Sequence, residues 1–261
     1  MKPDSVIITP LSKKSLENFE KNSNTLYTVL ENSDGTDSDP FANKILRKRF
    51  IMRVYFILFL QLLITFSCSV FFNLNTVIQT FTNTIVAQNI YAFSVFNTLT
   101  IIGIFMCKPD MAKTTPINYI LLVLFTLSMA YSLSMATIII PTNTLLIATG
   151  ATTGVTGILT IYATQTTIDF TGWGNYLLAG LFSILLTVIL NFIFMNALIY
   201  SAISGAGALA FSGFIIYNTQ MITTRRYGYS VDDYAYASVS LYIDIINIFF
   251  YIIQIITCCK N

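Results

Sequence analysis

Long apolar runs separated by short polar gaps occupy most of this chain of 261 residues. The last run extends from Tyr234 to Thr257, and Asp244 is its single formally charged side chain. An α-helix needs about 20 mostly apolar residues to cross a bilayer core of about 30 Å, and seven runs reach this length. We therefore predict transmembrane helices near residues 51–72, 85–107, 117–140, 143–165, 175–195, 197–222 and 234–257. The count of seven depends on two short breaks, because the third and fourth runs are separated mainly by Pro141 and the fifth and sixth almost adjoin.

The overall composition supports a membrane protein. Hydrophobic residues make up 55% of the chain and charged residues 10%, against about 25% charged residues in soluble domains. The mean hydropathy is +0.70. The small net charge of +2 and the absence of a basic cluster interleaved with aromatic residues argue against a nucleic-acid partner. We predict an all-α integral membrane protein whose main partner is the lipid bilayer.

The chain has no histidine, which excludes several kinds of site. Ser-His-Asp catalysis, Cys-His catalysis and HExxH zinc sites all need that side chain. The cysteines show no CxxC spacing and do not suggest a disulfide framework. We therefore expect no enzymatic activity and no cofactor.

The start of the chain differs from the rest, because it is polar and rich in Ser, Asn and Asp. We interpret residues 1–45 as a disordered cytosolic tail, residues 46–257 as the membrane domain and residues 258–261 as a short C-terminal tail. With a cytosolic N-terminus, all of the 14 Lys and Arg residues except Lys260 lie on the cytosolic side, which is the distribution that the positive-inside rule favours. If the last segment were a re-entrant hairpin, Lys260 and the C-terminus would be cytosolic as well.

Small residues recur at helical spacing in two of the predicted helices. They are Gly150, Gly154 and Gly157 in the fourth helix, and Ser204, Ala208 and Ser212 in the sixth. In lipid, stripes of small residues let helix backbones approach closely and gain van der Waals contact. We predict that both stripes are helix-packing surfaces.

Asp244 is the only one of the 12 acidic residues that falls inside a predicted helix. An ionised Asp at the centre of a membrane helix costs about 2.5 to 3.5 kcal/mol on insertion scales, so it is expected to face protein or water. Other polar side chains share its helix face at spacings of 4, 3, 4 and 3: Ser240, Asp244, Asn247, Tyr251 and Gln254. The residues alone leave two roles open for Asp244. It is either an inert hydrogen-bonded clamp between helices or a carboxyl group that titrates and controls an ion path.

Four stretches of the sequence agree with motifs of one known family. "GAGALAFSGFIIYNTQMI" and "YAYASVSLYIDIINIFFYIIQII" resemble its GFIIYDTQ and SLYLDIINLFLYLLR motifs. "TTGVTGILTIYATQTTIDFTGWG" resembles its TxxxxGLTxYTxQTKxDFxxxG segment, and "LRKRFIMRVYFILFLQLLIT" resembles its first helix. On these motifs the chain is identified as a member of the transmembrane Bax-inhibitor-motif family, and it is most similar to the Lifeguard and Golgi anti-apoptotic branch.

The resemblance implies a seven-transmembrane-helix bundle in which six helices surround a central C-terminal helix with a buried acid. It also implies a pH-regulated calcium leak from an endomembrane store, such as the endoplasmic reticulum or the Golgi, and restraint of cell death. Ca2+ and H+ are then the transported ions, and membrane proteins of cell-death control are further partners. In the family, two aspartates share a proton and engage a basic residue near the end of the second helix.

Asp244 matches the second of these aspartates, but Asn218 stands in place of the first. An Asn–Asp pair has one titrating group instead of a coupled pair. It also lacks a second negative charge for Ca2+, which prefers several oxygen ligands, so Asp244 offers Ca2+ at most a weak site. The basic residue corresponds to Lys108, with Lys113 as a rival, and Met129 stands where relatives commonly carry Glu. We expect the family fold with altered ion handling.

Other functions remain to be weighed against an ion leak. A non-conducting membrane interaction protein that acts through partners is favoured by the missing acids and disfavoured by Asp244 and its polar stripe. A seven-helix receptor fits the helix count, but the chain lacks DRY-like and NPxxY-like motifs and has no Lys in the last helix. An intramembrane protease needs a histidine or two acids within the membrane, and the sequence offers neither.

Overall fold

The computed structural model describes residues 44–107, 114, 116–194, 197–224 and 233–258. Internal contacts divide the chain into two units, Met1–Lys44 and Ile45–Asn261, and apart from Lys44 the description concerns the second unit. Residues 1–43 of the predicted tail lie outside the described residues, and so do Lys108 and Lys113. What was predicted for these residues stays a prediction.

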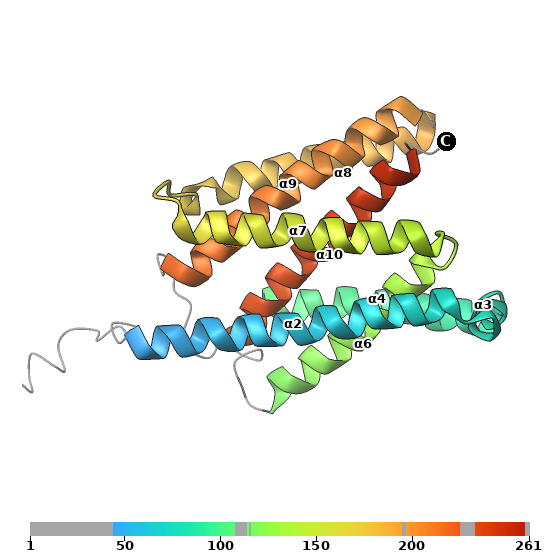
Figure 1. Ribbon diagram of the computed structural model, residues 1–261, viewed down its shortest axis with the longest axis horizontal. Helices are drawn as coiled ribbons and strands as arrows, with labels where there is room; N and C mark the ends of the chain where they lie inside the picture. The colour runs from blue at the N-terminus through green and yellow to red at the C-terminus, as the bar shows by residue number, and fades with distance from the viewer. Residues whose placement is uncertain (1–43, 108–113, 115, 195–196, 225–232, 259–261) are drawn as a thin grey trace, which may run out of the picture. The chain divides into compact units, whose positions relative to one another are not determined.

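Helices make up the regular structure of the described residues (Figure 1). In chain order they are α2 (Lys44–Leu74), α3 (Thr76–Thr82), α4 (Ile85–Cys107), α6 (Ile117–Thr137), α7 (Thr142–Gln165), the 3-10 turn η1 (Thr171–Trp173), α8 (Gly174–Phe194), α9 (Ala197–Thr224) and α10 (Tyr234–Cys258). Seven of these helices are long and apolar enough to cross a membrane, and each corresponds to one predicted run. The prediction of an all-α bundle with seven transmembrane helices is confirmed for the described part of the chain.

Asparagine and proline mark several of the helix breaks. Asn75 follows α2, and its side-chain oxygen accepts hydrogen bonds from the backbone N–H groups of Val77 (3.0 Å) and Ile78 (3.3 Å), which caps the start of α3. Pro116 and Pro141 directly precede α6 and α7. Because proline has no N–H to continue a helix, it interrupts the chain but is tolerated at a helix start. The break at Pro141 therefore separates two helices, as the count of seven requires.

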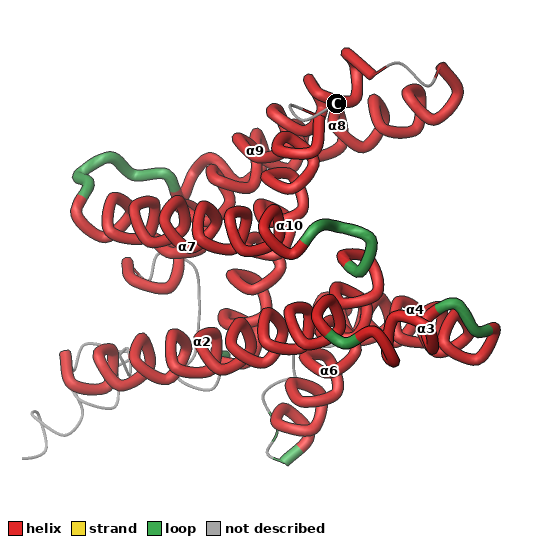
Figure 2. Tube along the Cα trace, turned by 45° about the vertical axis from the view of Figure 1, so that its right-hand side comes forward, coloured by secondary structure: helices red, strands yellow, loops and turns green. Residues whose placement is uncertain are grey.

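The C-terminal helix α10 is the central helix of the bundle. Of its most apolar segment, 50% is buried inside the protein, against 0% for α8. It packs against α9, α7 and α6, and in both Figure 1 and Figure 2 it passes between a group containing α2, α4 and α6 and a group containing α7, α8 and α9. Because α10 is one continuous helix of 25 residues, it is long enough to span, and the alternative of a re-entrant hairpin is wrong.

Aromatic side chains fix α10 against its neighbours. Tyr242 and Phe249 are fully buried. The ring of Tyr242 meets the ring of Phe125 on α6 edge to face, with 5.6 Å between centroids. Phe249 meets Phe66 on α2 in the same way, at 5.0 Å. Such pairs add about 0.5 to 1.5 kcal/mol each beyond the area that they bury, so they hold α10 in one rotation about its axis.

A row of polar side chains, the α2 ladder, runs along the buried face of α2 at a spacing of four residues: Gln61, Thr65, Ser69 and Asn73. All four bind other parts of the chain. The bonds join Gln61 Nε2 to Thr126 Oγ1 (3.1 Å), Thr65 Oγ1 to the Tyr242 hydroxyl (2.8 Å), Ser69 Oγ to Thr137 Oγ1 (2.6 Å) and Asn73 Nδ2 to the Ile140 carbonyl (2.8 Å). Polar side chains within a membrane bundle commonly find such partners on other helices. The ladder ties α2 to α6 and α10.

In the described part of the chain, no other helix packs against the glycine stripe of α7. Gly150, Gly154 and Gly157 are exposed, and a Cβ atom added to any of them would meet no atom within 4 Å. Instead, α7 packs through a face that includes Ala148 and Thr152. Since successive helix residues are about 100° apart, Thr152 and Gly150 lie on nearly opposite faces. The packing role predicted for these glycines is wrong, because spacing alone does not say which face of a helix the protein covers.

Candidate functional site

Asp244 lies in the interior of the bundle. Its side chain is 5% exposed. Asp244 is ten residues after the first residue of α10, so it lies about 15 Å along the helix axis. This distance is about half the thickness of a bilayer core. A carboxyl group at this depth needs hydrogen-bond partners within the protein.

Asn218 supplies the hydrogen bond that the structure shows for this carboxyl group. Its side-chain Nδ2 donates to Asp244 Oδ2 over 2.6 Å. Asn218 lies on α9 in the segment "YNTQ", where its neighbours Thr219 and Gln220 are buried. The bond therefore joins α9 to the central helix. The two residues that the motifs single out lie in direct contact.

The polar stripe of α10 faces α9 only in part. Gln254 Oε1 accepts a hydrogen bond from Ser204 Oγ on α9 over 2.9 Å. Ser240 and Asn247 bond to the backbone of their own helix, at the carbonyl groups of Tyr236 (3.1 Å) and Ile243 (2.8 Å). The structure thus brings Asp244 and Gln254 against α9, whereas the bonds shown for Ser240 and Asn247 stay within α10.

Tyr251 continues this interface through its ring. The ring lies against Gly207 of α9, where an added Cβ would come within 2.3 Å of its Cζ, and its centroid is 5.9 Å from that of Phe211. Only a residue without a side chain leaves room for the ring at this place. Sequence reasoning missed Gly207, although it stands in the same small-residue segment as Ser204.

Of the three small residues predicted to form a packing surface on α9, one is in close contact with α10. Ser204 is fully buried and bonded to Gln254. Ala208 and Ser212 are half-buried, and the Ser212 hydroxyl donates to the Ala208 carbonyl of its own helix (2.7 Å). The close approach of α8 occurs at Gly213 instead, where an added Cβ would be 2.7 Å from a Leu177 methyl group.

Gln220 holds the end of α9 to the loop between α7 and η1. Its side-chain oxygen accepts from the backbone N–H of Phe170 (2.7 Å), and its side-chain nitrogen donates to the carbonyl of Ile168 (2.8 Å). Asp169, between them in sequence, accepts from the backbone N–H of Thr171 (3.0 Å) and from its hydroxyl (2.5 Å). Sequence reasoning gave Gln220 no role, although it lies in the "YNTQ" segment that drew attention to Asn218.

The predicted basic partner lies outside the described residues, because these do not include Lys108 or its rival Lys113. Among the residues that are described, no group of three or more His, Cys, Asp or Glu side chains could hold a metal ion. The site is therefore one carboxyl group, one amide and the α9–α10 contacts that follow Asp244 on α10 and precede Asn218 on α9.

Comparison with known families places this site in a shared domain. Residues 47–260 match the model of a family described as inhibitor of apoptosis-promoting Bax1. The chain belongs to this Bax inhibitor family. Asn218 and Asp244 both fall within the matched residues.

Several members of the Bax inhibitor family align with most of the chain. Protein lifeguard 4 of Mus musculus is 33% identical over 213 residues, which cover 82% of this chain and 86% of the relative. The Golgi anti-apoptotic protein of Vaccinia virus (strain Lister) is 31% identical over 215 residues, covering 82% and 87%. Protein lifeguard 3 of Homo sapiens is 29% identical over 236 residues, covering 85% and 73%. The resemblance found in the motifs is thus confirmed over nearly the whole membrane domain.

Proposed function

We propose that this protein is a pH-sensitive calcium leak channel of an intracellular membrane and that it restrains cell death. The name of the vaccinia relative, Golgi anti-apoptotic protein, supports the cell-death role and an endomembrane location. The ion leak rests on one observation: a buried carboxyl group in the middle of the central helix is held by a neutral amide from the adjacent helix.

Protonation of Asp244 changes its bond to Asn218. An ionised carboxylate accepts the amide N–H in a bond about twice as strong as one between neutral groups. A protonated carboxyl group still accepts, but without the charge, so the bond weakens. Because Asn218 lies on α9 and Asp244 on α10, acidification loosens the contact between these helices. The leak therefore increases as the pH falls through the titration range of Asp244.

The α9–α10 interface contains the groups that such an opening would expose. The hydroxyl of Ser204, the amide of Gln254 and the phenol of Tyr251 all lie on it. In the structure these groups bond or pack against the facing helix. Once the helices separate, their polar atoms can replace part of the hydration shell of a passing cation.

Calcium flux into proteoliposomes tests the proposal. The full-length protein is reconstituted with an enclosed calcium dye, and the initial rate of flux is measured across pH for wild type, Asp244→Asn and Asn218→Asp. Asp244→Asn fixes the neutral state and should make the flux independent of pH. Asn218→Asp creates two interacting carboxyl groups, which titrate as a coupled pair and should displace the pH profile of the flux.

Ser240→Ala is the matched control, because Ser240 lies one turn away and bonds only to its own helix. It should keep the wild-type profile. Identical flux and pH profiles for wild type, Asp244→Asn and Asn218→Asp would refute the titration mechanism.

The second candidate function is a membrane interaction protein that acts on cell death through partners without conducting ions. The chemistry of the site favours it in one respect: Asn218 leaves a single carboxylate at the site, and the described residues form no cluster of acids, whereas Ca2+ takes six to eight oxygen ligands. Flux no greater than that of empty liposomes, for wild type and for Asn218→Asp alike, would decide for this function.

A further inference from the structure

We propose that the groove between α2 and α6 binds one anionic phospholipid, with its phosphate at Arg53 and an acyl chain along the groove. The groove has a volume of about 430 Å³, within the range of sites that hold small molecules. Apolar side chains from both helices form its walls: Phe56, Leu60 and Ile64 from α2, and Leu122, Val123 and Leu127 from α6. This binding does not depend on whether the protein conducts ions.

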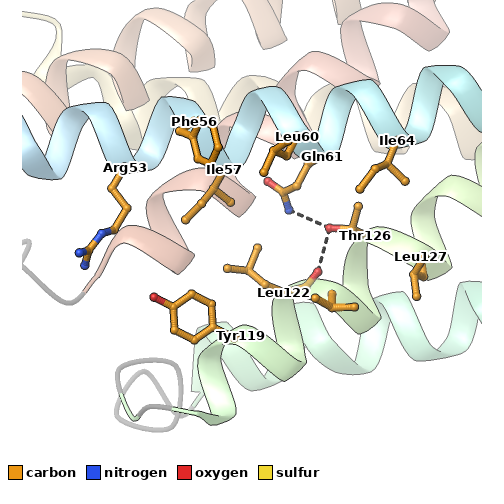
Figure 3. A pocket seen from close by; sticks show the side chains of 11 residues that line it. Arg53, Phe56, Ile57, Leu60, Gln61, Ile64, Tyr119, Leu122, Thr126 and Leu127 are labelled. Carbon is orange, nitrogen blue, oxygen red and sulfur yellow. Dashed lines mark hydrogen bonds between the residues drawn. The ribbon is translucent and has the colours of Figure 1, made fainter.

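The groove has one polar end and one apolar end. In Figure 3, Arg53 and Tyr119 lie at one end, and Ile64 and Leu127 lie at the other. The amide of Gln61 lies between them, and its nitrogen is bonded to Thr126. Within the groove, therefore, the charged group that a lipid headgroup meets is the Arg53 guanidinium.

Arg53 is prepared for an anion by its contact with Tyr234. The guanidinium carbon lies 5.0 Å from the centre of the Tyr234 ring. A guanidinium stacked on an aromatic face keeps its in-plane N–H donors, which match the geometry of a phosphate group. Tyr234 is itself fixed by a hydrogen bond from Asn118 Nδ2 to its hydroxyl (2.7 Å). The acid that precedes Tyr234 in sequence, Asp233, is buried and engaged in interactions of its own.

The depth of the groove fits one leaflet of a bilayer. From Arg53 to Asn73, at the end of α2, the helix rises about 30 Å, the thickness of the hydrocarbon core. Arg53 then lies at the headgroup level, where the exposed Tyr119 also lies near the start of its helix, as interfacial aromatic residues do. From Arg53 to Ile64 the rise is about 16 Å, which is the reach of an acyl chain in a single leaflet.

Charge selects the class of lipid. Arg47, Lys48 and Arg49 precede Arg53 on α2 and are exposed, so the helix carries further positive charge beyond the headgroup end of the groove. A basic residue near the surface attracts anionic lipid with about 1 kcal/mol. The apolar walls suit any acyl chain, whereas the guanidinium favours a headgroup with a net negative charge over a zwitterionic one.

Native mass spectrometry of the full-length protein in detergent tests this site. The protein is exposed to equal amounts of dioleoyl phosphatidylserine and dioleoyl phosphatidylcholine, and the fraction that retains one lipid of each kind is measured. Wild type should retain phosphatidylserine preferentially. Arg53→Gln should reduce that preference about fivefold, the factor that corresponds to about 1 kcal/mol. Lys48→Gln removes the same charge five residues earlier, outside the groove, and should have a smaller effect.

A second variant tests the groove itself by steric block. Val123 is 59% exposed on the wall, so Val123→Trp fills the groove without disturbing the core. This change should lower retention of the phosphatidylserine molecule and leave Arg53 in place. Equal retention of the two lipids by wild type, equal effects of Arg53→Gln and Lys48→Gln, or an unchanged lipid signal in Val123→Trp would each overturn the proposal.

Discussion

The contact between Gly207 and Tyr251 predicts a large effect from the smallest possible side chain. In Gly207→Ala the new Cβ would lie 2.3 Å from the ring carbon Cζ of Tyr251, whereas carbon atoms in ordinary contact are about 3.5 to 4.0 Å apart. The ring or the helix must therefore move by more than about 1 Å. The ring also packs on Phe211, so its retreat disturbs a second contact.

The size of the effect follows from two opposing contributions. Overpacking of a filled interior costs about 1 to 3 kcal/mol, and replacing a helical glycine by alanine gains up to about 1 kcal/mol of helix propensity. Gly205 is the matched control, because it lies two residues earlier on α9 and an added Cβ there would meet no atom within 4 Å. Gly205→Ala should leave the stability unchanged or raise it slightly. We expect Gly207→Ala to be less stable than Gly205→Ala by about 1 to 3 kcal/mol.

Unfolding of the purified protein in mixed micelles, followed by circular dichroism as sodium dodecyl sulfate is added, measures this difference. The double variant Gly207→Ala with Tyr251→Leu removes the ring and should recover most of the loss, since effects of contacting residues are not additive. If both alanine variants unfold at the same detergent fraction, the close approach of α9 and α10 described here is not present in the protein.

Two further predictions concern side chains that join separate segments. Asn218→Leu leaves the buried carboxyl group of Asp244 without the donor that the structure shows, and should lower the free energy of unfolding by about 1 to 3 kcal/mol. Asn247→Leu loses only a bond to its own helix and should lower it less. Equal losses in the two variants would contradict a stabilising bond between Asn218 and Asp244. Gln220→Leu removes both bonds to the loop at residues 166–170 and should speed amide hydrogen exchange of Phe170. Mass spectrometry of peptides measures this exchange. An unchanged rate would show that the loop is held by other contacts.

The positions of the transmembrane helices follow from the sequence because length and apolarity nearly suffice to define a span. The run predicted at 234–257 became α10 at Tyr234–Cys258, and the run at 85–107 became α4 with the same bounds. The short helix α3, with seven residues, gave no such signal. Its start depends on a single cap, Asn75, which a scan for apolar runs does not detect.

The candidate site was less predictable because its contacts lie between helices. Two matched motifs drew attention to Asn218 and Asp244, and the structure places them 2.6 Å apart. The role of small residues could not be assigned in the same way: three glycines on α7 are exposed, whereas Gly207 on α9 is covered by a ring. Which glycine touches a neighbour depends on the rotation of each helix, and a face of small and apolar residues can meet either lipid or protein.

The spacing of the α2 ladder limits how this protein can move. A screw motion of α2 by one residue would displace Gln61, Thr65, Ser69 and Asn73 together by about 1.5 Å along the helix axis and about 100° around it, away from partners that lipid cannot replace. The ladder therefore keeps α2 in register with α6. An opening between α9 and α10, as proposed above, would leave all four ladder bonds intact, so α2 and α6 would serve as a fixed frame during it.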